Sequence, residues 1–233
     1  MGMRIGIFGG SFNPIHFGHV RLARKLLALT GLDEVWFVVS PQNPLKRQNE
    51  LLDDQVRLEM VQAALRREKH MKASDVEFRL PKPSYTWNTL EMLKQEHPGD
   101  EFTLLIGGDN WERFHLWYRA EDIRNNYPIV VYPRSGSTTN TSPNPSEGEG
   151  IGNQKPDKKV VDQMDVGSDG ISSAAKVTTL PSFGGVGGGL GGGFPLINIS
   201  STMVRQRVRE GRPIDRLVPR PVARIIKERG LYL

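Results

Sequence analysis

The chain has no cysteine among its 233 residues. This absence excludes disulfide bonds, thiolate metal sites and cysteine nucleophiles, and it suits a cytoplasmic protein. Long hydrophobic runs are also missing, because the longest strongly apolar run, Val35 to Val39, is far too short to span a membrane. The first residues lack the basic and apolar regions of a signal peptide. We therefore expect a cytoplasmic protein with no membrane partner.

Two phosphate-binding motifs of other families are absent. No G-x-x-x-x-G-K-[ST] sequence occurs, which excludes a P-loop. Gly187, Gly189 and Gly192 formally fit the spacing G-x-G-x-x-G. They lie in a tract that is nearly all glycine and follow no strand pattern, so we do not interpret them as a dinucleotide-binding fingerprint.

The net charge of +5 raises the question of nucleic acid. Lys and Arg are interleaved with Asp and Glu along most predicted helices, which is typical of solvated faces. An anionic small substrate would account for part of the excess charge. We therefore expect no nucleic-acid partner, and the sequence leaves open whether the protein forms a homo-oligomer.

Short apolar runs typical of buried strands alternate with helical patterns through most of the chain. The runs lie at 4–8, 35–39, 73–78, 102–106, 129–132 and 196–199. This alternation predicts an α/β fold with a mostly parallel sheet covered on both faces. Ligands bind beyond the carboxyl ends of such strands, so the unusual loops after the first, second and fourth runs should meet at one site.

Residues 134–194 interrupt this pattern with Ser, Thr, Asn, Pro and Gly clusters. About sixty residues without periodicity inside a compact domain are typical of a flexible insertion. We predict a single domain made of residues 1–133 and 195–233, carrying a disordered low-complexity insertion at 134–194.

The chain begins with a strand, a glycine-containing loop and a helix, which together span residues 4–20. In this arrangement the free N–H groups at the helix start favour an anion such as phosphate. His16 and His19 are three residues apart, so both side chains leave one side of the first helical turn. Two imidazoles beside free amides suit a polyphosphate; a structural pair or a metal pair with an unidentified third ligand are the alternatives.

Two segments carry a resemblance to a known family. Residues 10–19 fit G-x-F-x-P-x-H-x-G-H, and residues 199–205 fit I-S-S-T-x-x-R. Both signatures resemble those of the nucleotidyltransferase superfamily, and together they are similar to bacterial nicotinate-nucleotide adenylyltransferases. The resemblance implies a Rossmann-like, doubly wound parallel sheet. It also implies transfer of AMP from ATP to nicotinate mononucleotide, giving nicotinate adenine dinucleotide and pyrophosphate in NAD biosynthesis. Mg²⁺ would be held mainly by the ATP phosphates, with no metal ligand from the protein.

The resemblance assigns catalytic roles to His16, His19 and Arg205. The implied ATP-binding residues are Gly9, Gly10, Ser11, Phe12, His16, His19, Gly107, Asp109, Ile199, Ser200, Ser201, Thr202 and Arg205. For the second signature, a helix cap followed by a surface arginine is the alternative. Asp109 follows two glycines at the end of a strand, where its carboxylate could bind a ribose hydroxyl or cap a helix.

The implied acceptor-binding residues are Asn43, Lys46, Thr86, Trp117 and Tyr118. In the family, amides near the Thr bind the nicotinate carboxylate and an aromatic ring stacks on the pyridine. The alternatives are a solvated loop lysine at Lys46 and a core role for Trp117.

Four other functions remain open from the sequence. The same chemistry could act on nicotinamide mononucleotide or on phosphopantetheine, although phosphopantetheine adenylyltransferases usually carry Thr at the position of His16. A non-catalytic protein that binds adenine nucleotides, or one that binds RNA, is the alternative from another class.

Overall fold

The computed structural model describes residues 2–41, 51–133, 176–180 and 199–233. Its centre is a six-stranded sheet in the order β3-β2-β1-β4-β5-β6, and every neighbouring pair is parallel. The strands are β1 Arg4–Gly10, β2 Glu34–Val39, β3 Met71–Ser74, β4 Glu101–Gly107, β5 Ile129–Tyr132 and β6 Val177–Thr179. This order, which reverses beside β1, is that of the Rossmann fold. The predicted fold class is confirmed.

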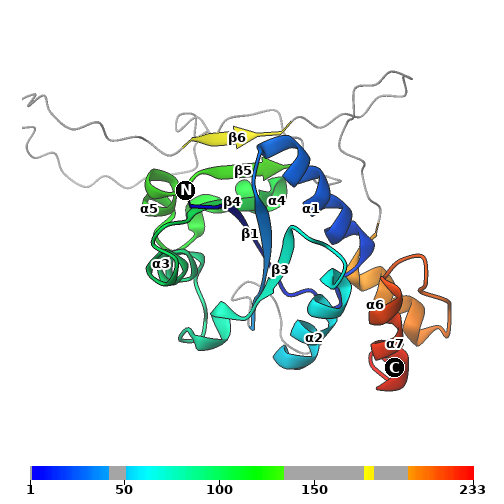
Figure 1. The fold of residues 1–233 in the computed structure, drawn as a ribbon. Helices are drawn as coiled ribbons and strands as arrows, with labels where there is room; N and C mark the ends of the chain where they lie inside the picture. The colour runs from blue at the N-terminus through cyan, green and yellow to red at the C-terminus, as the bar shows by residue number, and fades with distance from the viewer. Residues whose placement is uncertain (1, 42–50, 134–175, 181–198) are drawn as a thin grey trace, which may run out of the picture.

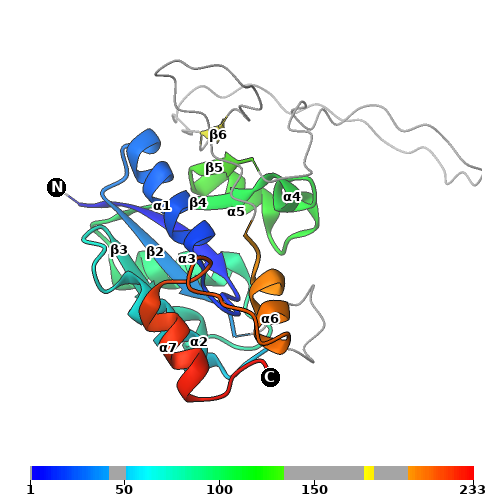
Figure 2. The ribbon, with the colours of Figure 1, turned by 90° about the vertical axis from the view of Figure 1, so that its right-hand side faces the viewer.

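Helices cover both faces of the sheet (Figure 1). They are α1 Phe17–Thr30, α2 Asp54–Leu65, α3 Thr86–Glu96, α4 Gly108–Trp111, α5 Ala120–Asn126, α6 Ser201–Arg209 and α7 Arg220–Glu228, with 3-10 turns η1 Val76–Arg79 and η2 Phe114–Leu116. Figure 1 shows α1 and α2 on one side of the sheet and α3 and α5 on the other. Figure 2 shows α7 beside α2, a pair that the contacts confirm.

Alternation along the strands builds two hydrophobic clusters. Phe8 and Phe37 belong to the cluster under α1 and α2, whereas Ile7 and Trp36 belong to the cluster under α3 and α5. Successive strand residues point to opposite faces, and here both faces are buried. For that reason these strands appear in the sequence as continuous apolar runs.

The sequence predicts that Gly31 ends the first helix, that Asp53 or Asp54 caps the second, and that Ser200 or Ser201 caps the helix of the second signature. Gly31 ends α1 with φ +66°, in the left-handed region. Asp53 begins α2, and its carboxylate accepts bonds from the N–H groups of Gln55 and Val56. Ser200 caps α6 by accepting from the N–H of Met203 at 3.1 Å. These local interactions place the helix starts beside the strand ends.

Two predicted elements differ in their bounds. The third strand was expected at 73–78, but it ends at Ser74, and the 3-10 turn η1 follows. There the Ser74 hydroxyl accepts the N–H of Val76, which ends the ladder. The sequence also predicts a short helical stretch through Trp117 and on to Arg124. The structure divides this region into α4, η2 and α5, and Arg119, which is left-handed with φ +55°, separates η2 from α5.

The structure describes residues 176–180, which lie within the insertion predicted at 134–194. Within this segment Val177–Thr179 forms β6, which pairs with β5, and Leu180 is buried. Three residues are too short to produce a detectable period, so pairing with the edge of β5 overrides local composition. The rest of the expected insertion, together with residues 196–198 of the expected last strand, lies outside the described residues. In the described part of the chain, no helix is long and apolar enough to cross a membrane.

Candidate active site

The first signature lies at the carboxyl end of β1, where the loop bends around a buried phenylalanine. Phe12 is 2% exposed, and its ring packs against Phe8 and Phe37 at centroid distances of 5.8 and 5.5 Å. Its backbone has φ +43°, a strained value for a side chain of this size. A Cβ added at Gly10 would lie 3.0 Å from the Phe12 ring. The glycine and the phenylalanine are therefore required together.

The two signature histidines stack at the start of α1. Their ring centroids are 3.7 Å apart with an interplanar angle of 25°. The His16 N–H donates to Nδ1 of His19 at 3.3 Å, so in the neutral His19 ring the proton lies on Nε2. His16 is buried and His19 is half-buried. His19 can therefore offer a donor from the start of α1. In the described ranges no group of three or more metal-ligating side chains occurs, so the alternative of a histidine metal pair finds no third ligand there.

The second signature contacts the first directly. The Ser201 hydroxyl donates to the carbonyl oxygen of Pro14 at 2.9 Å, and Arg205 Nη1 donates to that of Asn13 at 2.9 Å. Arg205 Nη2 also lies 3.5 Å from the Thr202 hydroxyl. Segments almost two hundred residues apart therefore meet at one loop. Ser201 and Arg205 hold the backbone of that loop, a role that local sequence could not reveal.

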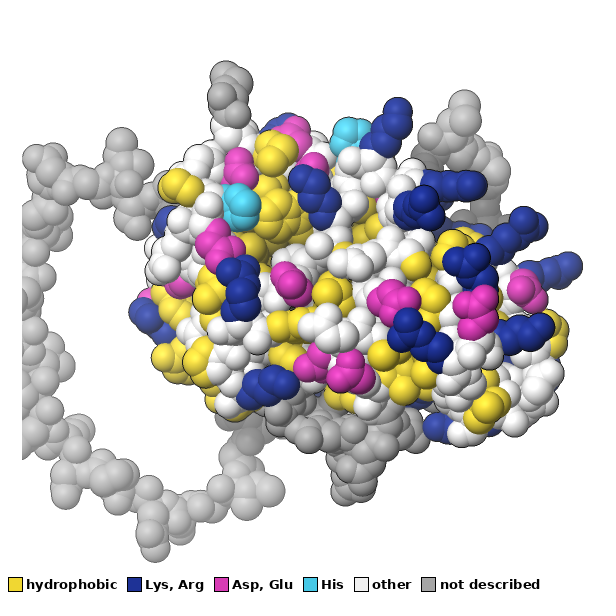
Figure 3. All heavy atoms as spheres, turned by 60° about the horizontal axis from the view of Figure 1, so that its bottom comes forward, with side chains coloured by type: hydrophobic (Ala, Val, Ile, Leu, Met, Phe, Trp, Pro, Cys, Tyr) yellow, Lys and Arg dark blue, Asp and Glu magenta, His cyan; other side chains and the backbone are white. Residues whose placement is uncertain are grey.

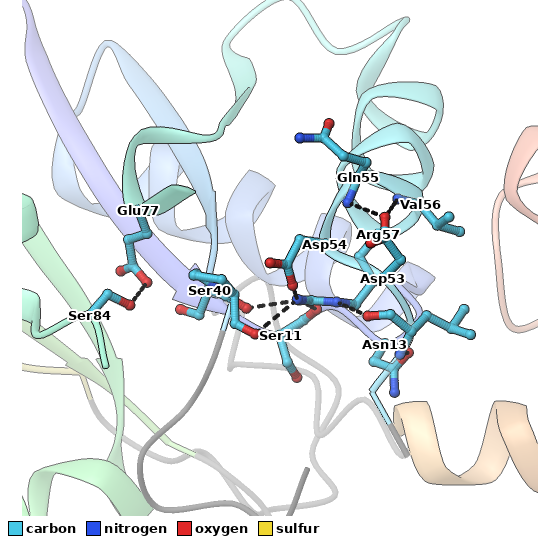
Figure 4. A network of polar contacts seen from close by, with 12 residues as sticks. Ser11, Asn13, Ser40, Asp53, Asp54, Gln55, Val56, Arg57, Glu77 and Ser84 are labelled. Carbon is cyan, nitrogen blue, oxygen red and sulfur yellow. Dashed lines mark hydrogen bonds and ion pairs between the residues drawn. The ribbon is translucent and has the colours of Figure 1, made fainter. Parts of the chain in front are cut away.

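A buried arginine that sequence reasoning missed joins two loops, the one between β1 and α1 and the one between β2 and α2 (Figure 4). Arg57 on α2 is 0% exposed. Its guanidinium donates to the carbonyl oxygens of Ser11 at 2.6 Å, Ser40 at 2.9 Å and Leu52 at 3.0 Å. Asp54 pairs with it at 2.5 Å. The sequence contained one signal for this arginine. Arg57 lies three residues before Met60 and four before Val61, a helical spacing that places it on the apolar side of α2.

The side chain of Asn13, in the same loop, is bound by two residues outside both signatures. Its Oδ1 accepts from the Tyr232 hydroxyl at 2.8 Å and from the Leu52 N–H at 3.4 Å. Tyr232 follows α7, and burial raises the pKa of its hydroxyl, which keeps the proton on the donor. The sequence analysis did not single out Tyr232, because a tyrosine near a helix end carries no motif.

Some of the predicted acceptor residues come together at the start of α3. Tyr85 is the N-cap of the helix that Thr86 begins, and its ring lies 4.9 Å from that of Tyr118. Tyr118 is 50% exposed, whereas Trp117 packs against Phe114 and the core under α3. The packing of Trp117 fits the core alternative. Asn43 and Lys46 lie outside the described residues.

A buried carboxylate supports this helix start. Glu77 accepts from the hydroxyls of Ser84 at 2.7 Å and Thr89 at 3.0 Å, and all three residues are buried. The sequence Ser84-Tyr85-Thr86 predicts a cap for this helix. The structure makes Tyr85 the N-cap residue without a side-chain capping bond, and the Ser84 hydroxyl donates to Glu77.

The remaining predicted nucleotide residues lie at strand and helix ends. Gly107 ends β4 and is the N-cap residue of α4, and Asp109 lies in the first turn of that helix. Ile199 directly precedes the cap of α6 and is half-buried. On the face shown in Figure 3, Lys and Arg side chains gather on the side formed by α6 and α7. An anionic ligand near α6 would therefore meet a positive field.

The strand order, the loop at the switch point and the two helix starts define a nucleotide-binding protein of the Rossmann type. Comparison with known families gives the particular one: the chain belongs to the cytidylyltransferase-like family, whose model matches residues 7–207.

Curated relatives resemble the chain over its whole length. A protein of Flavobacterium johnsoniae named "Probable nicotinate-nucleotide adenylyltransferase" is 36% identical over 99% of each chain. One of Christiangramia forsetii with the same name is 34% identical over 100% of each chain. A third, from Bacteroides fragilis, is 51% identical over 60% of this chain and 69% of its own.

Solved structures share the fold. The nicotinic acid mononucleotide adenylyltransferase of Plasmodium falciparum complexed with NaAD has a TM-score of 0.66 at 17% identity, covering 99% of this chain and 97% of that one. The same enzyme complexed with APC has a TM-score of 0.64 at 16% identity over the same shares. At this identity the likeness establishes the fold.

Proposed function

We propose that this protein is a nicotinate-nucleotide adenylyltransferase that moves AMP from ATP to nicotinate mononucleotide in NAD biosynthesis. The observation that carries the proposal is the contact of Ser201 and Arg205 with the carbonyl oxygens of Pro14 and Asn13, because it joins the two signatures around one loop. The names of relatives that match along the whole chain support the choice of acceptor.

The chemistry needs positioning and charge stabilisation more than a protein nucleophile. A phosphate oxygen of nicotinate mononucleotide attacks the α-phosphorus of ATP in line. The bond from that phosphorus to the bridging oxygen breaks, and pyrophosphate leaves with the electron pair. His19, with its Nε2 proton, would donate to the phosphate oxygens while charge shifts onto the leaving group. His16 and Arg205 would add donors and positive charge beside the same loop.

Mg²⁺ would enter with ATP in this proposal. The described residues include no cluster of acidic and histidine side chains able to hold an ion unaided. We therefore propose that the triphosphate supplies most of the ligands of the ion, which neutralises charge on the phosphates. We also propose that the protein works in the cytoplasm, where ATP is available.

The acceptor is tested by measuring pyrophosphate release from ATP and Mg²⁺ with nicotinate mononucleotide, nicotinamide mononucleotide or phosphopantetheine. We expect release with nicotinate mononucleotide, because a helix start such as that of α3 favours a carboxylate. If release is faster with nicotinamide mononucleotide or with phosphopantetheine, that compound is the acceptor in place of nicotinate mononucleotide. If none of the three acceptors gives pyrophosphate release, the proposed adenylyltransferase activity is refuted, and a protein that only binds nucleotides is favoured.

RNA binding is the alternative that the positive charge raises. It requires affinity that falls steeply as salt is raised. We expect no retention of a single-stranded RNA oligonucleotide at 0.15 M salt, together with full pyrophosphate release. Salt-sensitive RNA binding without turnover would favour the alternative.

A further inference from the structure

The loop between β1 and α1 has most of its carbonyl oxygens bound. The carbonyl groups that accept a hydrogen bond include that of Gly10, which ends β1, and those of Ser11, Asn13 and Pro14 in the loop. The donors are the Ser40 N–H to Gly10 at 2.9 Å, Arg57 to Ser11 at 2.6 Å, Arg205 to Asn13 at 2.9 Å and Ser201 to Pro14 at 2.9 Å.

This arrangement matters for a phosphate because carbonyl oxygens repel it and N–H groups attract it. In a planar trans peptide the N–H points opposite to the carbonyl group. When Arg57 binds the Ser11 carbonyl, the N–H of Phe12 is turned away from Arg57. Ser201 acts in the same way through Pro14, turning the N–H of Ile15 away from Ser201. Holding the carbonyl groups therefore sets where the loop offers its donors.

Arg57 reaches further than the other donors because it also binds the loop after β2. Its Nη1 lies 2.6 Å from the Ser11 oxygen and 2.9 Å from the Ser40 oxygen, and its Nη2 lies 3.4 Å from that of Pro41. Burying a guanidinium is costly unless its donors are satisfied, and here the carbonyl oxygens and Asp54 do so. A side chain with no exposed surface holds the loop without lying against the ligand.

Tyr232 completes the arrangement on the side chain of Asn13. The bond from its hydroxyl to Oδ1 is 2.8 Å, and the Leu52 N–H shares that oxygen at 3.4 Å. Leu52 is also the residue whose carbonyl group binds Nε of Arg57. Arg57 and Tyr232 therefore act on one connected unit, the loop 11–14 and the residues just before α2.

We propose that Arg57 and Tyr232 are positioning residues for this reaction, which hold the phosphate-binding loop from outside both signatures without touching a substrate. The proposal rests on the proposed function. It assigns to α2 and to the segment after α7 control over how the loop presents its amides to ATP.

The sharpest test removes one hydroxyl. Tyr232→Phe keeps the half-buried ring and loses only the bond to Asn13, so we expect kcat to fall about fivefold, as for one hydrogen bond. The KM for nicotinate mononucleotide should stay within twofold. Tyr127→Phe is the matched control, because it removes a hydroxyl bonded to Glu91 at 2.6 Å, away from the loop. Equal kcat in both variants would overturn the role of Tyr232.

Arg57→Lys tests the geometry, since lysine keeps the charge but cannot reach several carbonyl groups at once. We expect at least a tenfold loss in kcat with the acceptor KM unchanged. Arg24→Lys is the control, because Arg24 pairs with Glu68 on the surface. A folded Arg57→Lys variant with normal kcat would contradict the proposal. If Arg57→Lys does not fold, the kcat of Tyr232→Phe decides whether the proposal holds.

Binding of a non-hydrolysable ATP analogue separates this inference from the proposed function. We expect Tyr232→Phe to weaken analogue binding about fivefold, and Tyr127→Phe to leave it unchanged. If the wild type binds the analogue but releases no pyrophosphate with any acceptor, the proposed function fails. The role of Tyr232 is then still tested by comparing the analogue affinity of Tyr232→Phe with that of the wild type. If Tyr232→Phe changes neither analogue binding nor turnover, the positioning role of Tyr232 is refuted, and the proposed function is unaffected.

Discussion

At the scale of single residues, His19 has the clearest assignment. Its ring is half-buried, stacks on His16 and has Nδ1 occupied by a backbone N–H. That bond sets the orientation of the ring and leaves Nε2 as the donor of the neutral form. A side chain arranged in this way matters most where charge develops in the transition state.

We expect His19→Ala to lower kcat at least a hundredfold while the fold stays intact, because the lost contact acts chiefly in the transition state. Steady-state kinetics and circular dichroism would measure both effects. His115→Ala is the control, since His115 is exposed in η2 and belongs to neither signature. A His19→Ala variant with near-normal kcat would remove this residue from the mechanism.

Gly10 is the second residue-scale test. A methyl group there would lie 3.0 Å from the Phe12 ring, which Phe8 and Phe37 prevent from moving. We expect Gly10→Ala to cost about 1–3 kcal/mol in the free energy of unfolding, the usual range for overpacking. Urea denaturation would measure it. Gly99→Ala serves for comparison, because nothing lies within 4 Å of a Cβ at that position, and equal stability of the two variants would refute the packing argument.

At the scale of elements, β6 shows how pairing decides structure where composition does not. Its partners on β5 are Ile129, Val130 and Val131, all buried. The strand extends the sheet beyond β5 and delivers Leu180 to the hydrophobic cluster under α1. A short edge strand of this kind gains its stability from the sheet it joins.

We expect Leu180→Ala to lower the free energy of unfolding by about 2–3 kcal/mol, as for a buried leucine. Thermal unfolding would show the change. Thr179→Ala, an exposed position in β6, should shift the free energy by no more than about 0.5 kcal/mol. If both variants unfold like the wild type, β6 contributes nothing to stability.

At the scale of the whole molecule, ion pairs between segments make stability depend on pH. The Arg4 N–H and guanidinium lower the pKa of Asp33, joining the start of β1 to the segment before β2. A side-chain bond from Arg79 in η1 likewise lowers the pKa of Glu96 at the end of α3. These carboxylates take up protons less readily in the folded chain than in the unfolded one.

A carboxyl group with a lowered folded pKa stabilises the protein above its unfolded pKa, about 4, and this contribution disappears as pH falls through the folded value. We therefore expect the free energy of unfolding to fall as pH drops from about 5 to about 3. Urea denaturation at several pH values would measure the slope. Asp33→Asn should reduce the slope in this range, and an unchanged slope would show that Asp33 is not part of it.

Most of the fold was predictable because most strands and helices had a local signal. The apolar runs at 35–39 and 129–132 lie within β2 and β5, and Gly31, Asp53 and Ser200 cap the helices expected of them. The short strand β6 and the division at Arg119 had no such signal. They depend on pairing with β5 and on one left-handed residue.

The sequence by itself determined the alternation of strands and helices up to β5, the two signatures and the chemistry they suggest, because these depend on residue types at short spacings. Only the tertiary structure decided what holds the phosphate loop. Arg57, Ser201 and Tyr232 lie far from one another in the chain, and each bonds to the backbone or an amide within residues 11–14. A carbonyl group has the same chemistry at every position, so no local pattern in the sequence can specify which donor it will meet.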